Sequence, residues 1–494
     1  MNIPKRRLFG TDGIRGIANR YPLTPEMVQK IGIAYGVYLN SKFPEEKHTV
    51  VVGKDTRLSS DMIKTAFISG LTSTGVDVID VDVVPTPAIS FFIREGNLSG
   101  GVMISASHNP YEYNGLKFFN REGRKFSEVE EASLELVIFN KFELPKAFPE
   151  NVGRVFDGEN LVEGYEKFLE SAGRYLAGLK IGIDCANGAT FKIAPEIFKA
   201  LGAKVFVFNA EPDGLNINED CGATSPDFLA SKVKDLKLNV GFAYDGDGDR
   251  CIAVDENGEI VDGDQIMAIL AAHYMDRNKT VVATVMSNIG LELFLKELGI
   301  NLIRTNVGDR LVSEKMVETE ALVGGEQSGH IILRDFLETG DGLLTSVILA
   351  SIVKSTRKPL SQLANMMKKY PQKLKNLKVK EKKPIEKMEK VREAIDQAEK
   401  RMEGRGRVLV RYSGTEPLIR IMVEADDEKL IEEIIELIEE AIRKEGIKTH
   451  GEACNLYYYA ISCCCNTNTE INFFFSEKVL KARETKFSVI PILF

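Results

Sequence analysis

The chain has no tryptophan, and only five of its 494 residues are histidine. It also lacks any run approaching the ~20 consecutive apolar residues that a membrane-spanning helix requires. Its basic start, MNIPKRRLFG, has no apolar segment of the kind found in secretory signals. From these absences we expect a cytoplasmic protein with no membrane partner.

Positive charge is also in short supply, because 64 Lys and Arg face 72 Asp and Glu, for a formal net charge of −8. An acidic chain is a poor ligand for nucleic acid, so we expect no nucleic-acid partner. With 44% hydrophobic and 28% charged residues, the composition is typical of a soluble globular protein. Such a protein can still bind sugar phosphates if a few cations converge in one cleft. The candidates are Arg15, Lys117, Arg250, Arg411 and Arg420.

Cysteine is sparse over most of the chain. Cys185, Cys221 and Cys251 stand alone, as is typical of a reducing compartment, and the other four lie between residues 454 and 465. Three of those four are consecutive, which is not the spacing of a zinc site.

The segment ISASHNPYEYNG, residues 104–115, offers a hydroxyl nucleophile. Its Ser107 follows the apolar run Val102–Ile104, where a strand is expected to end in an Asn-Pro turn. A Ser-His pair in a loop usually has no catalytic role, so this segment alone is weak evidence for a nucleophile.

The segment YDGDGDR, residues 244–250, places Asp245, Asp247 and Asp249 at alternate positions with glycine between them. On an extended backbone these carboxylates can converge on one hard cation, and oxygen ligands suit Mg²⁺. A solvated surface turn is the plain alternative. An EF-hand calcium loop is a more specific alternative, because Glu256 is at position 12 when Asp245 is counted as position 1. Arg250 argues against it, since it occupies position 6, where that loop needs glycine. We therefore interpret the triplet as a magnesium loop between two strands.

The segment RYSGTEPLIR, residues 411–420, follows a strand-like run. Ser413, Gly414 and Thr415 can form a nest of hydroxyl and backbone amide donors, and Arg411 and Arg420 can bind phosphate oxygens. A hairpin with a salt-bridged rim explains the same residues equally well.

The segment GGEQSGH, residues 324–330, places Glu326, Ser328 and His330 at alternate positions. In an extended loop the three side chains would face one way and could hold sugar hydroxyls. A polar turn is the alternative. Taken together, a serine, a carboxylate-bound Mg²⁺ and several cations favour phosphoryl transfer through a covalent enzyme intermediate.

Hydrophobic periodicity predicts a chain of α/β units. Thr24 and Pro25 are typical of a helix start, and Val28, Ile31 and Tyr35 would share one face of that helix. The Lys-rich stretch 368–383 favours a solvated boundary before a small final domain. We expect three mixed α/β domains at 1–154, 155–254 and 255–368, a smaller α+β domain at 369–447, and an atypical tail at 448–494 to which we assign no function.

The motifs FGTDGIRG, SASHNP, DGDGDR, GEQSGH and RYSGTEP occur in the order found in the α-D-phosphohexomutase family, and the resemblance runs from about residue 7 to about residue 446. Within that family the chain resembles the phosphoglucosamine mutase branch. FGTDGIRG, the VGDR segment at 307–310 and Gln327 carry this finer resemblance.

The resemblance implies four domains around a central cleft and a phosphate carried on Ser107. Phospho-Ser107 would convert glucosamine 6-phosphate to glucosamine 1-phosphate through a glucosamine 1,6-bisphosphate, which turns round in the cleft. Asp245, Asp247, Asp249 and a phosphoserine oxygen would hold one Mg²⁺. A bisphosphate of glucosamine or glucose would serve as activator, and a homodimer is expected.

The remaining roles follow from the chemistry and the resemblance. Arg15, Lys117 and Arg250 would stabilise developing charge. His108, His330 and Lys117 are candidate proton carriers, with His330 the first choice. Glu326 and Ser328 would bind sugar hydroxyls, and the cluster at 411–420 would hold the phosphate that is not transferred.

Three alternatives remain open: a phosphomannomutase/phosphoglucomutase, a phosphatase that uses the same serine, and a catalytically silent sugar-phosphate binder. The phosphate nest disfavours a phosphatase, and the intact serine and aspartates disfavour a silent binder.

Overall fold

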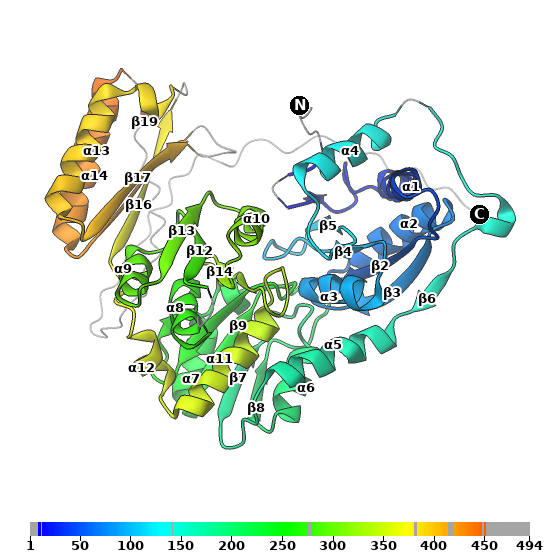
Figure 1. The fold of residues 1–494 in the computed structure, drawn as a ribbon, viewed down its shortest axis with the longest axis horizontal. Coiled ribbons are helices and arrows are strands. Elements are labelled where there is room, and N and C mark those ends of the chain that lie inside the picture. Colours follow the sequence, from blue (N-terminus) through cyan, green and yellow to red (C-terminus); the bar gives the residue numbers. More distant parts are fainter. Residues whose placement is uncertain are drawn as a thin grey trace, which may run out of the picture.

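A computed structural model describes residues 8–10, 12–140, 142–274, 278–379, 383–412 and 418–446, together with the backbone of 449–450. Four sheets with their helices form four domains, numbered 1 to 4 along the chain. Figure 1 shows domain 1 on the right, domain 4 at the upper left, and domains 2 and 3 between and below them. Within the described ranges, no helix is both long and apolar enough to cross a bilayer.

Domain 1 is built on a mixed sheet with the strand order β1-β5-β4-β2-β3-β6. Its strands are β1 (Ile14–Ile17), β2 (Thr49–Lys54), β3 (Asp77–Val83), β4 (Gly100–Ile104), β5 (Tyr113–Phe119) and β6 (Val155–Asp157), and its helices are α1 (Pro25–Lys42), α2 (Ser60–Thr72), α3 (Thr86–Gly96) and α4 (Glu128–Ile138). The predicted first helix is confirmed: the Thr24 hydroxyl caps α1, and Val28, Ile31 and Tyr35 are buried on one face.

Domain 2 is built on a sheet with the order β11-β10-β9-β7-β8. Its elements are α5 (Glu159–Ala172), β7 (Lys180–Asp184), α6 (Ile193–Ala200), β8 (Lys204–Phe208), α7 (Asp227–Leu236), β9 (Val240–Tyr244), β10 (Cys251–Asp255) and β11 (Ile260–Val261). The sheets extend slightly beyond the expected boundaries at 154 and 254, because β6 pairs with β3 and β11 pairs with β10.

Domain 3 has the strand order β13-β12-β14-β15. Its elements are α8 (Gly263–Tyr274), β12 (Thr280–Thr284), α9 (Ile289–Glu297), β13 (Asn301–Thr305), α10 (Asp309–Thr319), β14 (Val323–Gly325), β15 (Ile331–Leu333), α11 (Gly342–Thr356) and α12 (Leu360–Ala364). Buried side chains such as Val51, Ile181 and Val281 belong to one continuous apolar cluster. Domains 1, 2 and 3 therefore pack as one body.

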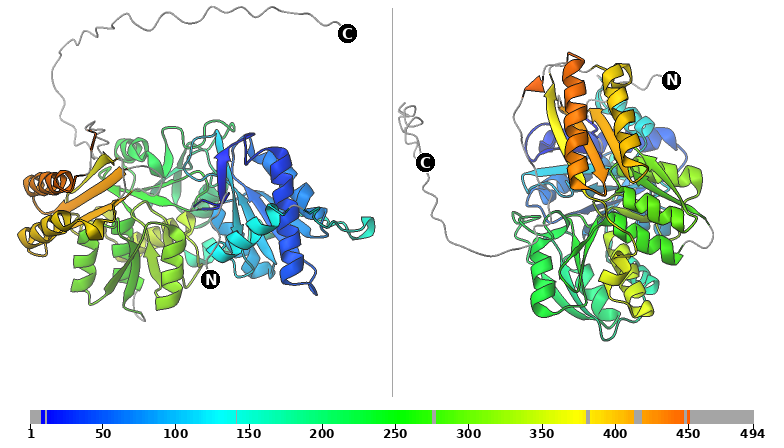
Figure 2. Two further views of the ribbon diagram at one scale, coloured as in Figure 1. Left: turned by 90° about the horizontal axis from the view of Figure 1, so that it is seen from above. Right: turned by 90° about the vertical axis from the view of Figure 1, so that its left-hand side faces the viewer.

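Domain 4 is an antiparallel sheet with two helices and its own apolar core. Its elements are β16 (Gln372–Val379), α13 (Glu389–Met402), β17 (Gly406–Tyr412), β18 (Leu418–Ala425), α14 (Glu428–Lys444) and β19 (Thr449–His450). Figure 2 shows both helices against the sheet. Half of the Lys-rich stretch, residues 372–379, is an interior strand rather than a solvated boundary, because Leu377 and Val379 of β16 are buried while Lys378 between them is exposed.

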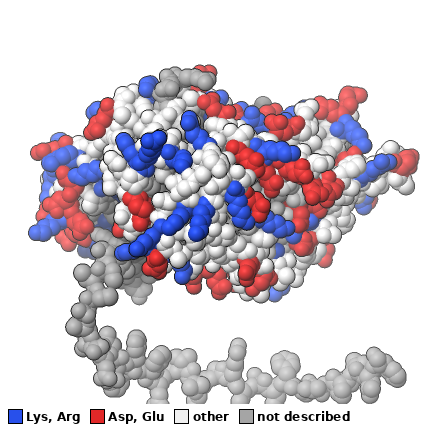
Figure 3. All heavy atoms as spheres, turned by 90° about the horizontal axis from the view of Figure 1, so that it is seen from below, with Lys and Arg blue, Asp and Glu red and all other residues white. Residues whose placement is uncertain are grey.

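The surface carries both signs of charge. Figure 3 shows Lys and Arg side chains interspersed with Asp and Glu over the face seen from below.

Candidate active site

Ser107 lies in the loop after β4, an interior strand of the domain 1 sheet. Its side chain is buried, and its Oγ donates a hydrogen bond to Asp245 Oδ2 at 2.7 Å. His108 Nδ1 lies 3.2 Å from the same hydroxyl oxygen. The serine of domain 1 therefore meets the acidic loop of domain 2, as the family resemblance implies.

The Asp triplet forms the tight connection between the antiparallel strands β9 and β10. One oxygen from each of Asp245, Asp247 and Asp249 lies within 4.8 Å of the others, and all three residues are buried. Asp247 Oδ1 and Asp249 Oδ1 are buried without a hydrogen-bond partner among the described residues. Buried carboxylate oxygens need a compensating partner, so this donor set fits a hard divalent cation.

Lys117 reaches the triplet from β5. Its Nζ lies 2.7 Å from Asp247 Oδ2, 3.1 Å from Asp12 Oδ2 and 3.5 Å from Asp249 Oδ2. Burial opposes the charge on this amine, but the three carboxylates outweigh burial and hold the pKa of Lys117 well above its usual range. Lys117 is therefore a fixed ammonium ion beside the candidate metal site.

Arg15 and Arg250 border the same loop. Arg15 donates a hydrogen bond to Asn109 and pairs with Asp12, while the backbone N–H of Arg250 donates to Asp245 Oδ1 at 3.2 Å. Partial burial and these two guanidinium groups lower the pKa of His108 to about 4, although His108 keeps access to solvent. His108 is therefore neutral at pH 7.

The GEQSGH segment is a tight turn between β14 and β15, not the extended loop expected from the sequence. The N–H of Glu326 donates to the His330 carbonyl at 2.9 Å, which closes the turn. Ser328 Oγ donates to Glu326 Oε2 at 3.2 Å, and Ser328 is exposed while His330 is buried. The three side chains therefore do not share one face, because pairing of β14 with β15 determines the backbone here.

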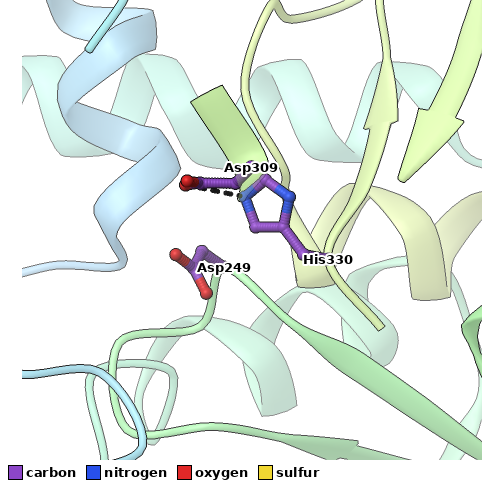
Figure 4. Close-up of side chains that lie close together, drawn as sticks. All are labelled: Asp249, Asp309 and His330. Carbon is purple, nitrogen blue, oxygen red and sulfur yellow. Dashed lines mark ion pairs between the residues drawn. The ribbon is translucent and has the colours of Figure 1, made fainter. Parts of the chain in front are cut away.

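His330 nevertheless approaches the acidic loop. Its Nε2 lies 3.8 Å from Asp309 Oδ2, and Figure 4 shows both residues beside Asp249. Neither ring nitrogen of His330 has a hydrogen-bond partner within the described part of the chain. A bound ligand could therefore supply the partner that these buried nitrogens lack.

Arg411 and Arg420 lie directly opposite each other on β17 and β18 of domain 4. Burial and the neighbouring Arg420 lower the pKa of Arg411. Ser413, Gly414 and Thr415, which the sequence assigns to the phosphate nest, lie outside the described residues.

Sequence reasoning missed several residues of the site. Thr86 Oγ1 hydrogen-bonds Asp247, and its N–H donates to the Asp247 carbonyl at 2.8 Å. Lys125 pairs with both Asp12 and Asp309. Asp12 lies in the FGTDGIRG motif together with Arg15, so this motif was an available signal for Asp12. The contact of Thr86 with Asp247 spans 161 residues, and no local signal indicated it.

A cavity of about 500 Å³ opens next to the site between domains 1 and 3. Its lining carries both signs of charge: Arg124, Lys125 and Arg310 lie there with His330 and with the carboxylates of Glu130, Asp309, Glu314 and Glu338. The volume suits a hexose phosphate, since small-molecule pockets begin at roughly 300 Å³.

The acidic loop should release protons when a divalent cation binds to it. Burial, Asp249 and Asp247 raise the pKa of Asp245 to about 8, so the metal-free protein holds a proton that the unfolded chain loses near pH 4. The contribution of the Asp245 carboxyl to the free energy of unfolding is therefore lost as pH rises towards 8. In the folded protein a cation can replace the Asp245 proton. Calorimetry in buffers of different ionisation enthalpy should detect proton release at pH 7 and much less at pH 9. Equal release at both pH values would contradict this assignment.

Comparison with known proteins identifies the fold family. Four models of the phosphoglucomutase/phosphomannomutase family match in order: α/β/α domain I at residues 6–144, domain II at 162–258, domain III at 262–370 and the C-terminal domain at 374–441. A solved phosphoglucomutase/phosphomannomutase family protein from Burkholderia thailandensis is 25% identical, with a TM-score of 0.77 over 90% of this chain and 98% of its own.

Curated relatives are closer in sequence. The phosphoglucosamine mutase of Caldicellulosiruptor bescii is 49% identical over 431 residues, which are 85% of this chain and 95% of the relative. That of Caldanaerobacter subterraneus subsp. tengcongensis is 50% identical over 444 residues, 88% of this chain and 99% of the relative. With four family domains in order and relatives of this similarity, the chain belongs to the phosphoglucomutase/phosphomannomutase family.

Proposed function

We propose that the protein is a phosphoglucosamine mutase, which interconverts glucosamine 6-phosphate and glucosamine 1-phosphate. The observation that carries this proposal is the contact of the Ser107 hydroxyl with the Asp triplet at 2.7 Å. Relatives that bear this name are 45–50% identical over most of the chain. The finer resemblance in VGDR and Gln327 supports the glucosamine branch.

In this mechanism, phospho-Ser107 donates its phosphoryl group to a sugar hydroxyl. The bond from phosphorus to Ser107 Oγ breaks as the bond to the sugar oxygen forms, which gives a sugar 1,6-bisphosphate. After the bisphosphate turns round, its other phosphate returns to Ser107. Phosphate thus moves between C6 and C1 without net hydrolysis.

Asp245, Asp247 and Asp249, with a phosphoserine oxygen, would hold one Mg²⁺. When bound, the ion offsets the negative charge of the transferring group. Lys117 and Arg250 add fixed positive charge beside the triplet, and Arg15 lies within the same cluster. Buried cations of this kind stabilise charge that develops in the transition state.

His330 is the proposed general base. It would take the proton from the attacking sugar hydroxyl, and its unpartnered ring nitrogens support this role. His108 is the alternative, since it is neutral at pH 7 and lies against Ser107. Glu326 and Ser328 would bind sugar hydroxyls in either orientation of the intermediate.

Arg411 and Arg420 would hold the phosphate that is not transferred. Two like charges directly opposite across strands destabilise a sheet, so a bound phosphate would relieve their repulsion. Arg411, Arg420 and residues 413–415 would together form a phosphate-binding arm of domain 4. Closure of domain 4 over the cleft would exclude water.

Replacing Arg411 with alanine should raise KM for glucosamine 6-phosphate about 10- to 100-fold, because one charge-assisted contact contributes roughly 1.5–3 kcal/mol. It should also increase the loss of bisphosphate into solution. Arg405→Ala, in the same domain with 59% of its side chain exposed, is the matched control and should leave KM unchanged. Normal kinetics for Arg411→Ala would refute the phosphate-arm assignment.

A phosphatase that uses Ser107 is the rival function. The two functions are distinguished by the products that the purified protein forms with Mg²⁺, glucosamine 6-phosphate and a trace of glucose 1,6-bisphosphate. A mutase forms glucosamine 1-phosphate without free phosphate, whereas free phosphate as the main product would establish hydrolysis.

The buried free thiols of Cys185, Cys221 and Cys251 support a cytoplasmic location. The proposed partner is a small amino-sugar phosphate, and a homodimer is part of the same proposal.

A further inference from the structure

Ser107 has a left-handed backbone with a φ of 51°. A non-glycine residue in this region is strained and persists only where its surroundings hold it. Ser107 Oγ donates to Asp245 Oδ2 and its N–H donates to Ser105 Oγ at 2.9 Å, so the carbonyl is the remaining polar group through which its backbone can be held.

Arg57 supplies part of that restraint. It follows β2, and its side chain is fully buried. Nη2 donates to the carbonyls of Ser107 at 2.9 Å and Asn109 at 2.7 Å, and Nη1 donates to the carbonyl of Pro110 at 2.5 Å. Nε is anchored on Asp55 Oδ2 at 2.8 Å. The planar fork of arginine can serve these carbonyls together, which the single ammonium group of lysine cannot.

Asn218 of domain 2 binds two of the same carbonyls from the other side. Its Nδ2 donates to Ser107 O at 3.0 Å and Asn109 O at 3.2 Å. Gly246 of the acidic loop packs here as well, since a Cβ at this position would lie 2.7 Å from Ser107 O. The Ser107 carbonyl is therefore fixed between two domains.

We propose that Arg57 and Asn218 form a carbonyl clamp, a pair of positioning residues that holds Ser107 in its left-handed conformation. The clamp keeps Ser107 Oγ against the acidic loop for both phosphoryl transfers. This inference rests on the proposed role of Ser107 as nucleophile. Both residues act through the loop backbone, so they should affect the rate of transfer more than the binding of substrate.

The test uses Asn218→Gly, which removes both donors, adds no charge and tolerates the φ of 59° at this position. We expect kcat to fall about 30- to 100-fold, because a misplacement of about 1 Å can cost 100-fold in rate. KM for glucosamine 6-phosphate should change by less than about 3-fold, and ³²P transfer from labelled glucose 1,6-bisphosphate to Ser107 should slow in parallel.

Asn216→Gly is the matched control, because Asn216 lies in the same loop and donates to the Glu211 carbonyl instead. It should keep wild-type kcat. Arg57→Lys retains the charge facing Asp55 but cannot serve the carbonyls, and it should repeat the loss of kcat. Wild-type kcat in both Asn218→Gly and Arg57→Lys would overturn the carbonyl clamp and leave the assignment of Ser107 as nucleophile intact. Absence of label on Ser107 in the wild-type protein would instead refute the proposed nucleophile.

Discussion

Replacing Ser107 with alanine should lower kcat by at least ~10⁴-fold, since no hydroxyl remains to carry the phosphoryl group between the two half-reactions. The fold should persist, because the hydrogen bonds of the lost oxygen in the described structure are those with Asp245 and His108. Steady-state assays with glucosamine 6-phosphate measure the loss, and circular dichroism with thermal unfolding checks the fold. Intact mass should also show that the wild-type protein accepts one phosphate from a sugar bisphosphate and that the variant does not.

Ser133→Ala is the matched control. Ser133 lies on α4, and its hydroxyl donates to the carbonyl of Val129 in the same helix. This variant should keep wild-type activity and phosphate uptake. Substantial turnover by Ser107→Ala would show that another group carries the phosphate.

Replacing Asp247 with asparagine should lower kcat/KM by at least ~10³-fold and weaken Mg²⁺ binding by at least ~100-fold, because one anionic ligand is lost. Asp247 also faces Lys117 at 2.7 Å, and this ion pair helps to hold the pKa of Asp247 below its usual value against the effect of burial. In the variant, the buried ammonium group of Lys117 therefore loses one of the carboxylates that offset its charge. Titration calorimetry measures Mg²⁺ affinity independently of activity.

Asp255→Asn tests whether any buried Asp nearby has this effect. Asp255 ends β10 and accepts the backbone N–H groups of Asn257 and Glu259 in the next turn. Its replacement should lower thermal stability without changing the Mg²⁺ affinity. Unchanged Mg²⁺ affinity in Asp247→Asn would exclude the triplet as the metal site.

Much of the fold is predictable from the sequence because the signals are local. The Thr24-Pro25 start and the 3.6-residue spacing of apolar residues determine α1. The loops of Ser107 and Asp245 each leave the carboxyl end of a buried strand, as local signals predict, whereas their meeting across two domains was implied by the family resemblance. In β16, the alternation of Leu377 and Val379 with Lys378 is an equally local signal of a strand. The high lysine content of the stretch instead favoured a solvated boundary.

The restraints on the site could not be predicted because they depend on tertiary contacts. Arg57 and Asn218 lie 50 and 111 residues from Ser107 in the chain, and nothing in their local sequence indicates that they bind its carbonyl. The turn at Glu326 likewise follows from pairing between strands rather than from the alternation of its polar residues.

The most direct test of the proposed function is the comparison of kcat/KM for glucosamine 6-phosphate, glucose 6-phosphate and mannose 6-phosphate, with Mg²⁺ and a trace of bisphosphate activator. We expect the value for glucosamine 6-phosphate to exceed each of the others at least ~10-fold, as a site adapted to the C2 amine should favour it. Equal or faster turnover of either hexose phosphate would contradict the assignment and identify a phosphomannomutase/phosphoglucomutase instead.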